Sequence, residues 1–251
     1  MSDFQGRLAL VTGATSGIGR ATARLLHARG ATVLATGRDA VALEHAEGGK
    51  RWIPLAGDLT DAAFRERLAA AAREQRGGLD ALVNAAGVLT GGTWEVTDLA
   101  LVDEMFDLNV RALYDLTRRV IPLLREARGA IVNVSSVAGT RAFPNLLAYC
   151  MSKAAVDQLT RCLALELGPD GVRVNAVNPG LVRTELHLRG GMDAASYAEF
   201  LERGKVTHPL GRIGTPDEVA EMIAFLVSDR AAWITGDTVA VDGGRAQTCL
   251  R

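Results

Sequence analysis

Short apolar runs alternate with longer amphipathic stretches along the whole chain, and this alternation limits the fold more than any other feature. The runs are rich in Val, Ile and Leu and show little two-residue alternation, which is typical of strands covered on both faces. They are Leu8–Val11, Thr32–Thr36, Trp52–Leu55, Ala81–Val83, Ala130–Val134, Val172–Val177 and Thr238–Val241. Strict alternation of strand and helix predicts right-handed crossovers and a parallel sheet between two helical layers.

The stretches between the runs place apolar residues three and four positions apart, as helices do. We expect helices at Gly17–Ala28, Asp61–Gln75 with Thr60 as its N-cap, Leu99–Arg125, Ala148–Gly168 and Pro216–Leu226. Pro122 is expected to kink or end the third of them. The sequence shows no internal repeat or linker, so we predict one doubly wound α/β domain of about seven strands over residues 1–251.

One segment breaks the rhythm, between the sixth strand and the helix at 216. Residues 183–211 contain a glycine pair, a weak helix around Ala194–Leu201 and a His-Pro pair. Because so long an interruption is usually functional, we expect a substrate-binding loop or lid here. Its mostly apolar candidates for lining a pocket are Leu186, Leu188, Met192, Tyr197, Phe200 and Leu201.

Charge and composition exclude several classes of protein. The 28 basic and 29 acidic residues give a net charge of −1, which argues against binding to nucleic acid or to an anionic membrane surface. With 48% hydrophobic and 23% charged residues the chain is globular rather than disordered. We expect no signal peptide, and no apolar run approaches the roughly 18 residues of a membrane span.

Cysteine and histidine usage predicts a cytoplasmic protein without a Cys-based zinc site or a catalytic metal. The three cysteines, at 150, 162 and 249, have no paired spacing, which suits a reducing compartment. The four histidines have no metal-ligand spacing, so no metal site is expected. We expect His27 and His45 on solvated helix faces, and His187 on a loop surface rather than against substrate.

A glycine-rich turn joins the first strand to the first helix, in the segment Thr12-Gly13-Ala14-Thr15-Ser16-Gly17-Ile18-Gly19. Glycine permits positive φ and lets backbone N–H groups approach a pyrophosphate, while the helix N-terminus favours the anion. The candidate cofactor contacts here are Gly13, Thr15, Ser16, Gly17, Ile18 and Gly19. The spacing differs from the commoner G-x-G-x-x-G, but its place between strand and helix indicates a dinucleotide site.

The residue after the second strand bears on the choice of cofactor. Dinucleotide sites place an acid here for the ribose 2′-OH, or an Arg for a 2′-phosphate. The sequence has Gly37 and Arg38, which favours NADP(H). An exposed loop arginine is the alternative interpretation of Arg38.

Ser136, Tyr149 and Lys153 form a candidate catalytic group. Ser136 ends the fifth strand, where ligands lie in open α/β sheets. Tyr149 and Lys153 are four residues apart on one helix face, so the ammonium is expected to lower the pKa of the phenol. The Ser136 hydroxyl is placed to polarise the same substrate oxygen.

Together these motifs make the chain resemble a short-chain dehydrogenase/reductase, from Gly6 to Gly244. The resemblance implies a Rossmann-like fold and adds Asn109 as a fourth catalytic residue, which holds a proton-relay water. It implies further cofactor contacts at Asp58, Leu59, Asn84, Ala85, Gly87, Pro179, Gly180, Val182 and Thr184, besides Tyr149 and Lys153. The segment 234–244 resembles the strand that packs subunits in family tetramers, so a homotetramer is expected.

The resemblance also implies the chemistry. Tyr149 exchanges a proton with the oxygen of a carbonyl or secondary alcohol, Ser136 bonds that oxygen, and Lys153 tunes Tyr149 and bonds the nicotinamide ribose. Relatives that prefer NADP often carry a basic residue where this chain has Ser16, so NAD(H) stays open, as in a secondary alcohol, hydroxy acid or polyol dehydrogenase. A catalytically silent dinucleotide-binding regulator is the non-enzyme alternative, which the intact tetrad disfavours.

Overall fold

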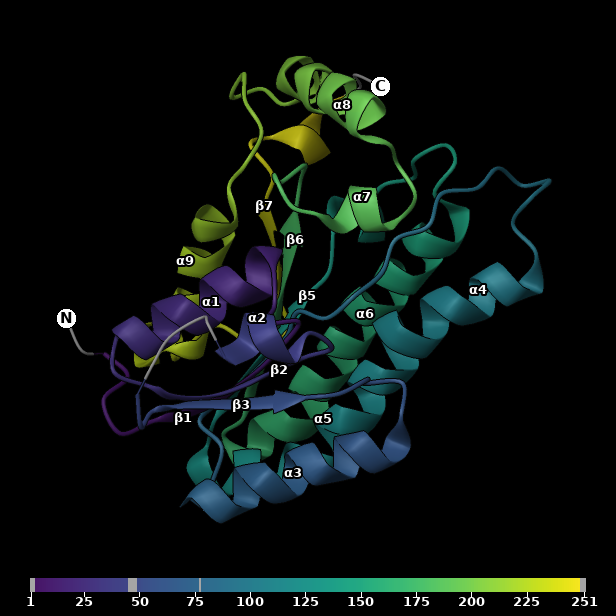
Figure 1. Ribbon diagram of the computed structural model, residues 1–251. Coiled ribbons are helices and arrows are strands. Elements are labelled where there is room, and N and C mark those ends of the chain that lie inside the picture. The colour runs from purple at the N-terminus through teal and green to yellow at the C-terminus, as the bar shows by residue number, and fades with distance from the viewer. Residues whose placement is uncertain (1–2, 45–48, 77, 249–251) are drawn as a thin grey trace.

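The computed structural model describes residues 3–44, 49–76 and 78–248 (Figure 1). Its strands are β1 (Leu8–Thr12), β2 (Thr32–Gly37), β3 (Trp52–Ala56), β4 (Ala81–Asn84), β5 (Ala130–Val134), β6 (Arg173–Pro179) and β7 (Thr238–Val241). They form one seven-stranded sheet in the order β3-β2-β1-β4-β5-β6-β7, and every pair is parallel. This confirms the predicted doubly wound α/β fold. The strand order reverses between β1 and β4, where such sheets bind ligands.

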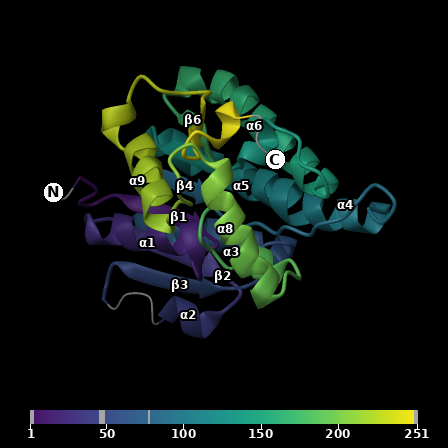
Figure 2. The same ribbon diagram turned by 90° about the horizontal axis from the view of Figure 1, so that it is seen from above.

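The helices are α1 (Gly17–Ala28), α2 (Ala40–Glu44), α3 (Ala62–Arg76), α4 (Leu99–Phe106), α5 (Leu113–Ala127), α6 (Leu147–Leu167), α7 (Leu186–Arg189), α8 (Ala194–Thr207) and α9 (Pro216–Val227). On one face of the sheet α1 and α9 pack together, and Leu26 and Ile223 are fully buried there. On the other face lie α3, α5 and α6, with Phe64 and Leu116 buried (Figures 1 and 2). Both faces of the central strands are therefore covered by helices and buried from solvent, which explains why these strands are mostly apolar.

The α3 helix begins one residue later than predicted, and Thr60 is not its N-cap. The Asp61 carboxylate accepts a hydrogen bond from the Ala63 N–H at 2.9 Å, so Asp61 caps the helix. The Thr60 hydroxyl instead donates to Asp58 at 2.8 Å. Thr60 and Asp61 can both serve as N-cap residues, and the sequence alone did not show that Asp61 takes the position.

The predicted helix at 99–125 is interrupted, but not by Pro122. A π-helical turn, Asp107–Ala112, separates α4 from α5, and α5 runs through Pro122 to Ala127. Pro122 is exposed, so the Arg118 carbonyl that it leaves without a helical partner can bond water. Of the two expected effects of Pro122, the end of the helix was wrong, and the kink stays a prediction. An interruption by a π-turn is the kind that accompanies functional sites.

His27 is buried rather than solvated, which corrects the expectation for this residue. Its ring meets the Trp52 ring edge-on, with 5.8 Å between centroids. His45 and Cys249 lie outside the described residues. Cys150 and Cys162 are free thiols. No helix of the described part of the chain has the length and apolar character needed to cross a membrane.

The segment 183–211 is more ordered than a loop. It forms α7 and then α8, which extends the expected weak helix from Leu201 to Thr207. The Asp193 carboxylate caps α8 by accepting from the Ser196 N–H at 2.9 Å. Figure 2 shows α8 lying over the carboxyl-end edge of the sheet.

Candidate active site

A cavity of about 600 Å³ opens at the carboxyl ends of the strands, beside the point where the strand order reverses. It is lined by most of the predicted site residues. These are Gly13, Thr15, Ser16, Gly17, Ile18, Gly19, Arg38, Ala85, Gly87, Ser136, Tyr149, Lys153, Pro179, Gly180, Val182 and Thr184. Four predicted residues, Asp58, Leu59, Asn84 and Asn109, are not part of this lining.

The glycine turn after β1 is shaped so that its backbone can approach a ligand. Gly13 has φ +67°, and a Cβ there would stand 2.9 Å from backbone atoms of Ala85 and Ala86. A Cβ on Gly19 would lie 2.3 Å from the Gly13 carbonyl oxygen. Only glycine fits these positions, and the N-terminus of α1 faces the cavity behind them. The turn therefore fits the pyrophosphate of a dinucleotide.

The end of β2 offers a cation beside this turn. Arg38 is exposed and lines the cavity. A Cβ on Gly37 would lie 2.6 Å from Thr15 Cγ2, so the glycine lets β2 pack closely against the turn. Asp58 accepts from the Thr60 N–H at 2.8 Å, and this bond, with help from the Arg38 charge, lowers the pKa of the Asp58 carboxyl.

A second cation reaches the turn from α7 and was missed by the sequence reasoning. The guanidinium of Arg189 donates to the Ser16 hydroxyl and to Glu185, the latter at 3.2 Å. Arg189 lines the same cavity as Arg38. Ser16 is the N-cap residue of α1, yet its side chain makes no capping bond. No local signal links residues 173 positions apart, so only the folded chain shows this contact.

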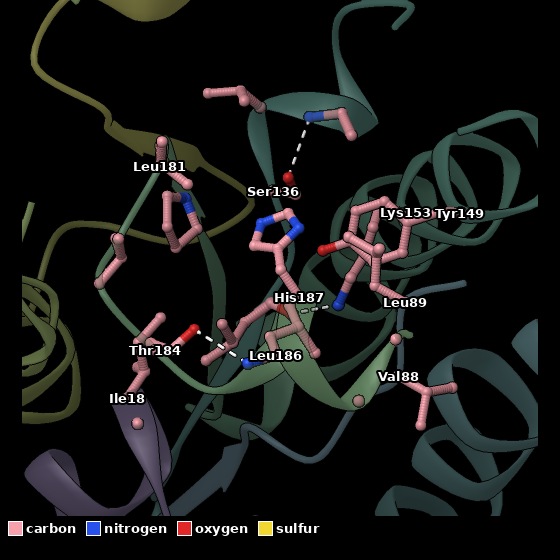
Figure 3. Close-up of a pocket in the computed structure, with 18 of the residues that line it drawn as sticks. Ile18, Val88, Leu89, Ser136, Tyr149, Lys153, Leu181, Thr184, Leu186 and His187 are labelled. Carbon is pink, nitrogen blue, oxygen red and sulfur yellow. Dashed lines mark hydrogen bonds between the residues drawn. The ribbon is translucent and has the colours of Figure 1, made fainter. Parts of the chain in front are cut away.

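Ser136, Tyr149 and Lys153 converge on the other half of the cavity, as their spacing predicted (Figure 3). Ser136 follows β5, and its hydroxyl lies near the phenol of Tyr149 on α6, where it acts to lower the pKa of that phenol. Tyr149 and Lys153 are 6% and 5% exposed. The Lys153 ammonium donates to the Val134 carbonyl at 2.8 Å and stands 5.6 Å from the centre of the Tyr149 ring.

Burial controls the titration of this pair. Loss of water raises the pKa of the Tyr149 phenol to about 12, although the Ser136 hydrogen bond opposes the shift. Burial also lowers the pKa of Lys153 to about 8, against the Asp157 charge that raises it. The phenol pKa is raised rather than lowered, contrary to the expectation from the neighbouring ammonium. Desolvation is the dominant cause, and the opposing contribution comes from Ser136.

Asn109 lies in the π-helical turn, behind the cavity wall. Its Oδ1 accepts from the Val88 N–H at 2.9 Å, and its Nδ2 donates to the Val88 carbonyl at 3.0 Å and to Ser152 at 3.1 Å. A Cβ on Gly87 would lie 3.1 Å from Asn109 Oδ1 and 3.7 Å from Lys153 Nζ. Asn109 therefore fixes the strand-end loop against α6, next to Lys153.

Asn84 belongs to a buried polar network between strands and helices. Its Nδ2 donates to Asn133 at 2.9 Å and to Thr117 at 3.2 Å. Asn133 in turn donates to Thr160 of α6 at 2.9 Å. These bonds tie β4 to β5 and position the strand ends that line the cavity.

The segment after β6 closes the cavity above the glycine turn. A Cβ on Gly180 would lie 2.8 Å from His208 Nε2, so no larger residue fits this crossing. The Thr184 methyl lies 3.1 Å from the Cβ position of Gly17. The Thr184 carbonyl accepts from the Tyr197 hydroxyl at 2.7 Å, which anchors α8 over the site.

Only some of the residues that were expected to line the rest of the cavity do so. Of the segment residues expected to line it, Leu186 and Phe200 do so, whereas Leu188, Met192, Tyr197 and Leu201 are not in the lining. His187 lines the cavity, contrary to the expectation of a surface position. Arg141 donates to the Ala246 carbonyl and is not a lining residue.

Known proteins resemble this chain along its whole length. Residues 13–246 match the family model described as enoyl-(acyl carrier protein) reductase. Human L-xylulose reductase is 41% identical over 243 residues, which cover 95% of this chain and 96% of that protein. Chicken D-erythrulose reductase is 39% identical, with 96% of each chain covered.

Solved structures agree with these sequence matches. A short-chain dehydrogenase/reductase from Caenorhabditis elegans, determined with its cofactor, superposes with TM-score 0.93 at 32% identity over 98% of this chain and 97% of that one. A 3-ketoacyl-(acyl-carrier-protein) reductase from Brucella melitensis in complex with NADH gives 0.87 at 34% identity over 96% and 99%. The chain therefore belongs to the short-chain dehydrogenase/reductase family. It is a nicotinamide-dependent oxidoreductase that acts on carbonyl groups or alcohols.

Proposed function

We propose that this oxidoreductase uses NADP(H) in preference to NAD(H), and that Tyr149 exchanges the proton at the oxygen of a ketone or secondary alcohol. The observation that carries the catalytic assignment is the convergence of Ser136, Tyr149 and Lys153 on one cavity with the glycine turn. When bound there, the nicotinamide supplies or accepts the hydride. The residues contribute position and charge.

The titration of the group fits proton donation. A phenol with a pKa of about 12 is protonated at neutral pH, so Tyr149 is ready to donate to a carbonyl oxygen. The Ser136 hydroxyl faces the same side of the cavity as the phenol, so it could bond the substrate oxygen beside Tyr149. Lys153 would then stabilise the phenolate that forms, because its ammonium lies beside the ring. Asn109 holds the neighbouring wall and remains the proposed site of a relay water.

The cofactor preference rests on two arginines beside the α1 turn. Arg38 and Arg189 line the cavity near Thr15 and Ser16, and a 2′-phosphate would be attracted by both. Gly37 offers no carboxylate to accept from a 2′-OH. The next acid, Asp39, is engaged in accepting from the Ala42 N–H at 3.0 Å at the start of α2.

The experiment that tests the catalytic assignment is Tyr149→Phe, with Tyr114→Phe as its control. Tyr114 is half exposed on α5 and does not line the cavity. Loss of a positioned acid should lower the turnover number by about 10²–10⁴-fold, with the affinity for NADPH unchanged. Steady-state rates and a fluorescence titration of NADPH measure both quantities. A Tyr149→Phe enzyme within a few-fold of Tyr114→Phe refutes the assignment.

We further propose a homotetramer, with segment 183–211 acting as a lid. Large apolar side chains are exposed on two separate regions of the monomer. Leu165 on α6 and Trp233 before β7 are 81% and 98% exposed, and Leu99 at the start of α4 is 81% exposed. Two self-complementary faces, each pairing with a copy of itself across a twofold axis, would build a closed tetramer.

The cytoplasmic location expected from cysteine usage stays a prediction.

A further inference from the structure

The lid helix α7 places an imidazole in the substrate half of the cavity. His187 lines the cavity, and Figure 3 shows its ring directed toward the side where Ser136 and Tyr149 present their hydroxyl groups. It thus points toward the place where the reacting oxygen would lie in the proposed function. The proposed mechanism gives this side chain no role.

Aromatic side chains from α8 hold the ring in place. The Phe200 ring is tilted against it with 4.7 Å between centroids, and the Tyr197 ring stacks at 6.4 Å. Tyr197 is itself anchored through its hydroxyl to the Thr184 carbonyl. The imidazole is therefore oriented before any ligand arrives, which reduces the entropy cost of binding.

Both ring nitrogens remain available to a ligand. Neither forms a hydrogen bond with another residue in the described part of the chain, although the ring is only partly exposed. Partial burial lowers the pKa of His187, so the imidazole is neutral at physiological pH. A neutral imidazole offers one N–H donor and one nitrogen acceptor.

The donor and the acceptor of the neutral imidazole fit some polar groups of a substrate better than others. A hydroxyl both donates and accepts, so it satisfies either nitrogen of a neutral imidazole. A carboxylate only accepts and would favour the protonated ring, which burial opposes. The neighbouring lining residues Leu89, Leu186 and Phe200 are apolar and would pack against a carbon chain.

We infer that His187 binds a hydroxyl group next to the reacting carbonyl, so that hydroxy ketones are the preferred substrate class. This assignment rests on the proposed function, because it places the carbonyl between Ser136 and Tyr149. It makes His187 a specificity residue that acts on binding of the substrate and leaves the proton transfer to Tyr149.

A matched pair of ketones tests the inference. Acetoin and 2-butanone share one carbon skeleton and differ in the hydroxyl beside the carbonyl. We expect wild type to prefer acetoin, and His187→Leu to lower kcat/KM for acetoin at least tenfold while 2-butanone changes less than threefold. His187→Gln, which keeps a donor and an acceptor, should recover part of the loss. Leu188→Ala, an α7 variant outside the cavity lining, should match wild type.

The possible results distinguish a failure of the His187 inference from a failure of the proposed function. Equal losses for both ketones would show that His187 only supports α7, and unchanged discrimination would show that it does not contact the hydroxyl. A wild-type enzyme that prefers 2-butanone also overturns the inference. Failure of wild type to reduce any ketone with either cofactor contradicts the proposed function itself, and the hydroxyl assignment falls with it. Titration with NADPH verifies that every variant is folded.

Discussion

The preference for NADPH should depend on Arg38 and Arg189 together. Arg38→Gln and Arg189→Gln each remove one guanidinium from the turn region while keeping side-chain bulk and polarity. If both arginines contact the 2′-phosphate, each variant weakens NADPH and leaves NADH nearly unchanged, because NADH lacks that group. The two losses should also be coupled, since both contacts would involve the same phosphate.

The structure sets the size of each loss. A charge-assisted hydrogen bond contributes about 1.5–3 kcal/mol, and the exposure of Arg38 places it near the lower end, or roughly tenfold in Kd. Arg189 must first release Ser16 and Glu185, so its net contribution is smaller, about threefold. We expect the double variant to lose roughly 10- to 30-fold in NADPH affinity.

Fluorescence titrations of NADPH and NADH at fixed ionic strength give two affinities for each variant, and the same two for wild type serve as the reference. Glu185→Gln is the matched control, because it frees Arg189 from its ion pair and should strengthen NADPH slightly. Equal losses for both cofactors would place the guanidinium groups at the pyrophosphate instead. A wild type that binds NADH more tightly would refute the cofactor assignment.

Two further predictions concern assembly and pH. Light scattering at micromolar concentration should give about four times the chain mass of 26.6 kDa, and Leu165→Ser with Trp233→Ser should reduce that mass; a wild-type monomer contradicts the tetramer. Ketone reduction should slow as pH rises through about 8, because Lys153 has a lowered pKa of about 8 and is protonated only below it. A kcat/KM profile from pH 6 to 10 that stays flat would show that the Lys153 charge is not used.

Local signals in the sequence were enough for the sheet and for much of the site. The β1 and β5 strands are fully buried and mostly apolar, with Thr12 and Asn133 as the polar exceptions. Burial on both faces explains why these runs stand out in the sequence. Tyr149 and Lys153 were found because one helical turn separates them. The glycine turn was found because close backbone approach leaves no other residue type.

Contacts made only in three dimensions were the ones that sequence reasoning missed. The α7 helix has four residues, which is too few to show any periodicity. The sequence therefore could not predict that His187 and Arg189 line the cavity. The π-helical turn around Asn109 has no compositional mark, and a proline nearby suggested a different interruption. His27 was misplaced because its burial depends on Trp52 of the neighbouring strand β3.

The largest correction concerns the phenol of Tyr149, and it bears on the direction of the reaction. Proximity of Lys153 suggested a phenolate, but burial raises the phenol pKa to about 12 while the ammonium bonds the Val134 carbonyl. With its pKa raised to about 12, the phenol is protonated at pH 7, so it can donate to a nascent alkoxide but cannot accept a proton until it ionises. Near neutral pH Tyr149 is therefore in the form that ketone reduction uses, and alcohol oxidation requires a phenolate that becomes more accessible as pH rises. Ketone reduction and oxidation of the matching alcohol should consequently show opposite slopes over the same pH series. Parallel slopes would mean that a group other than Tyr149 controls the proton.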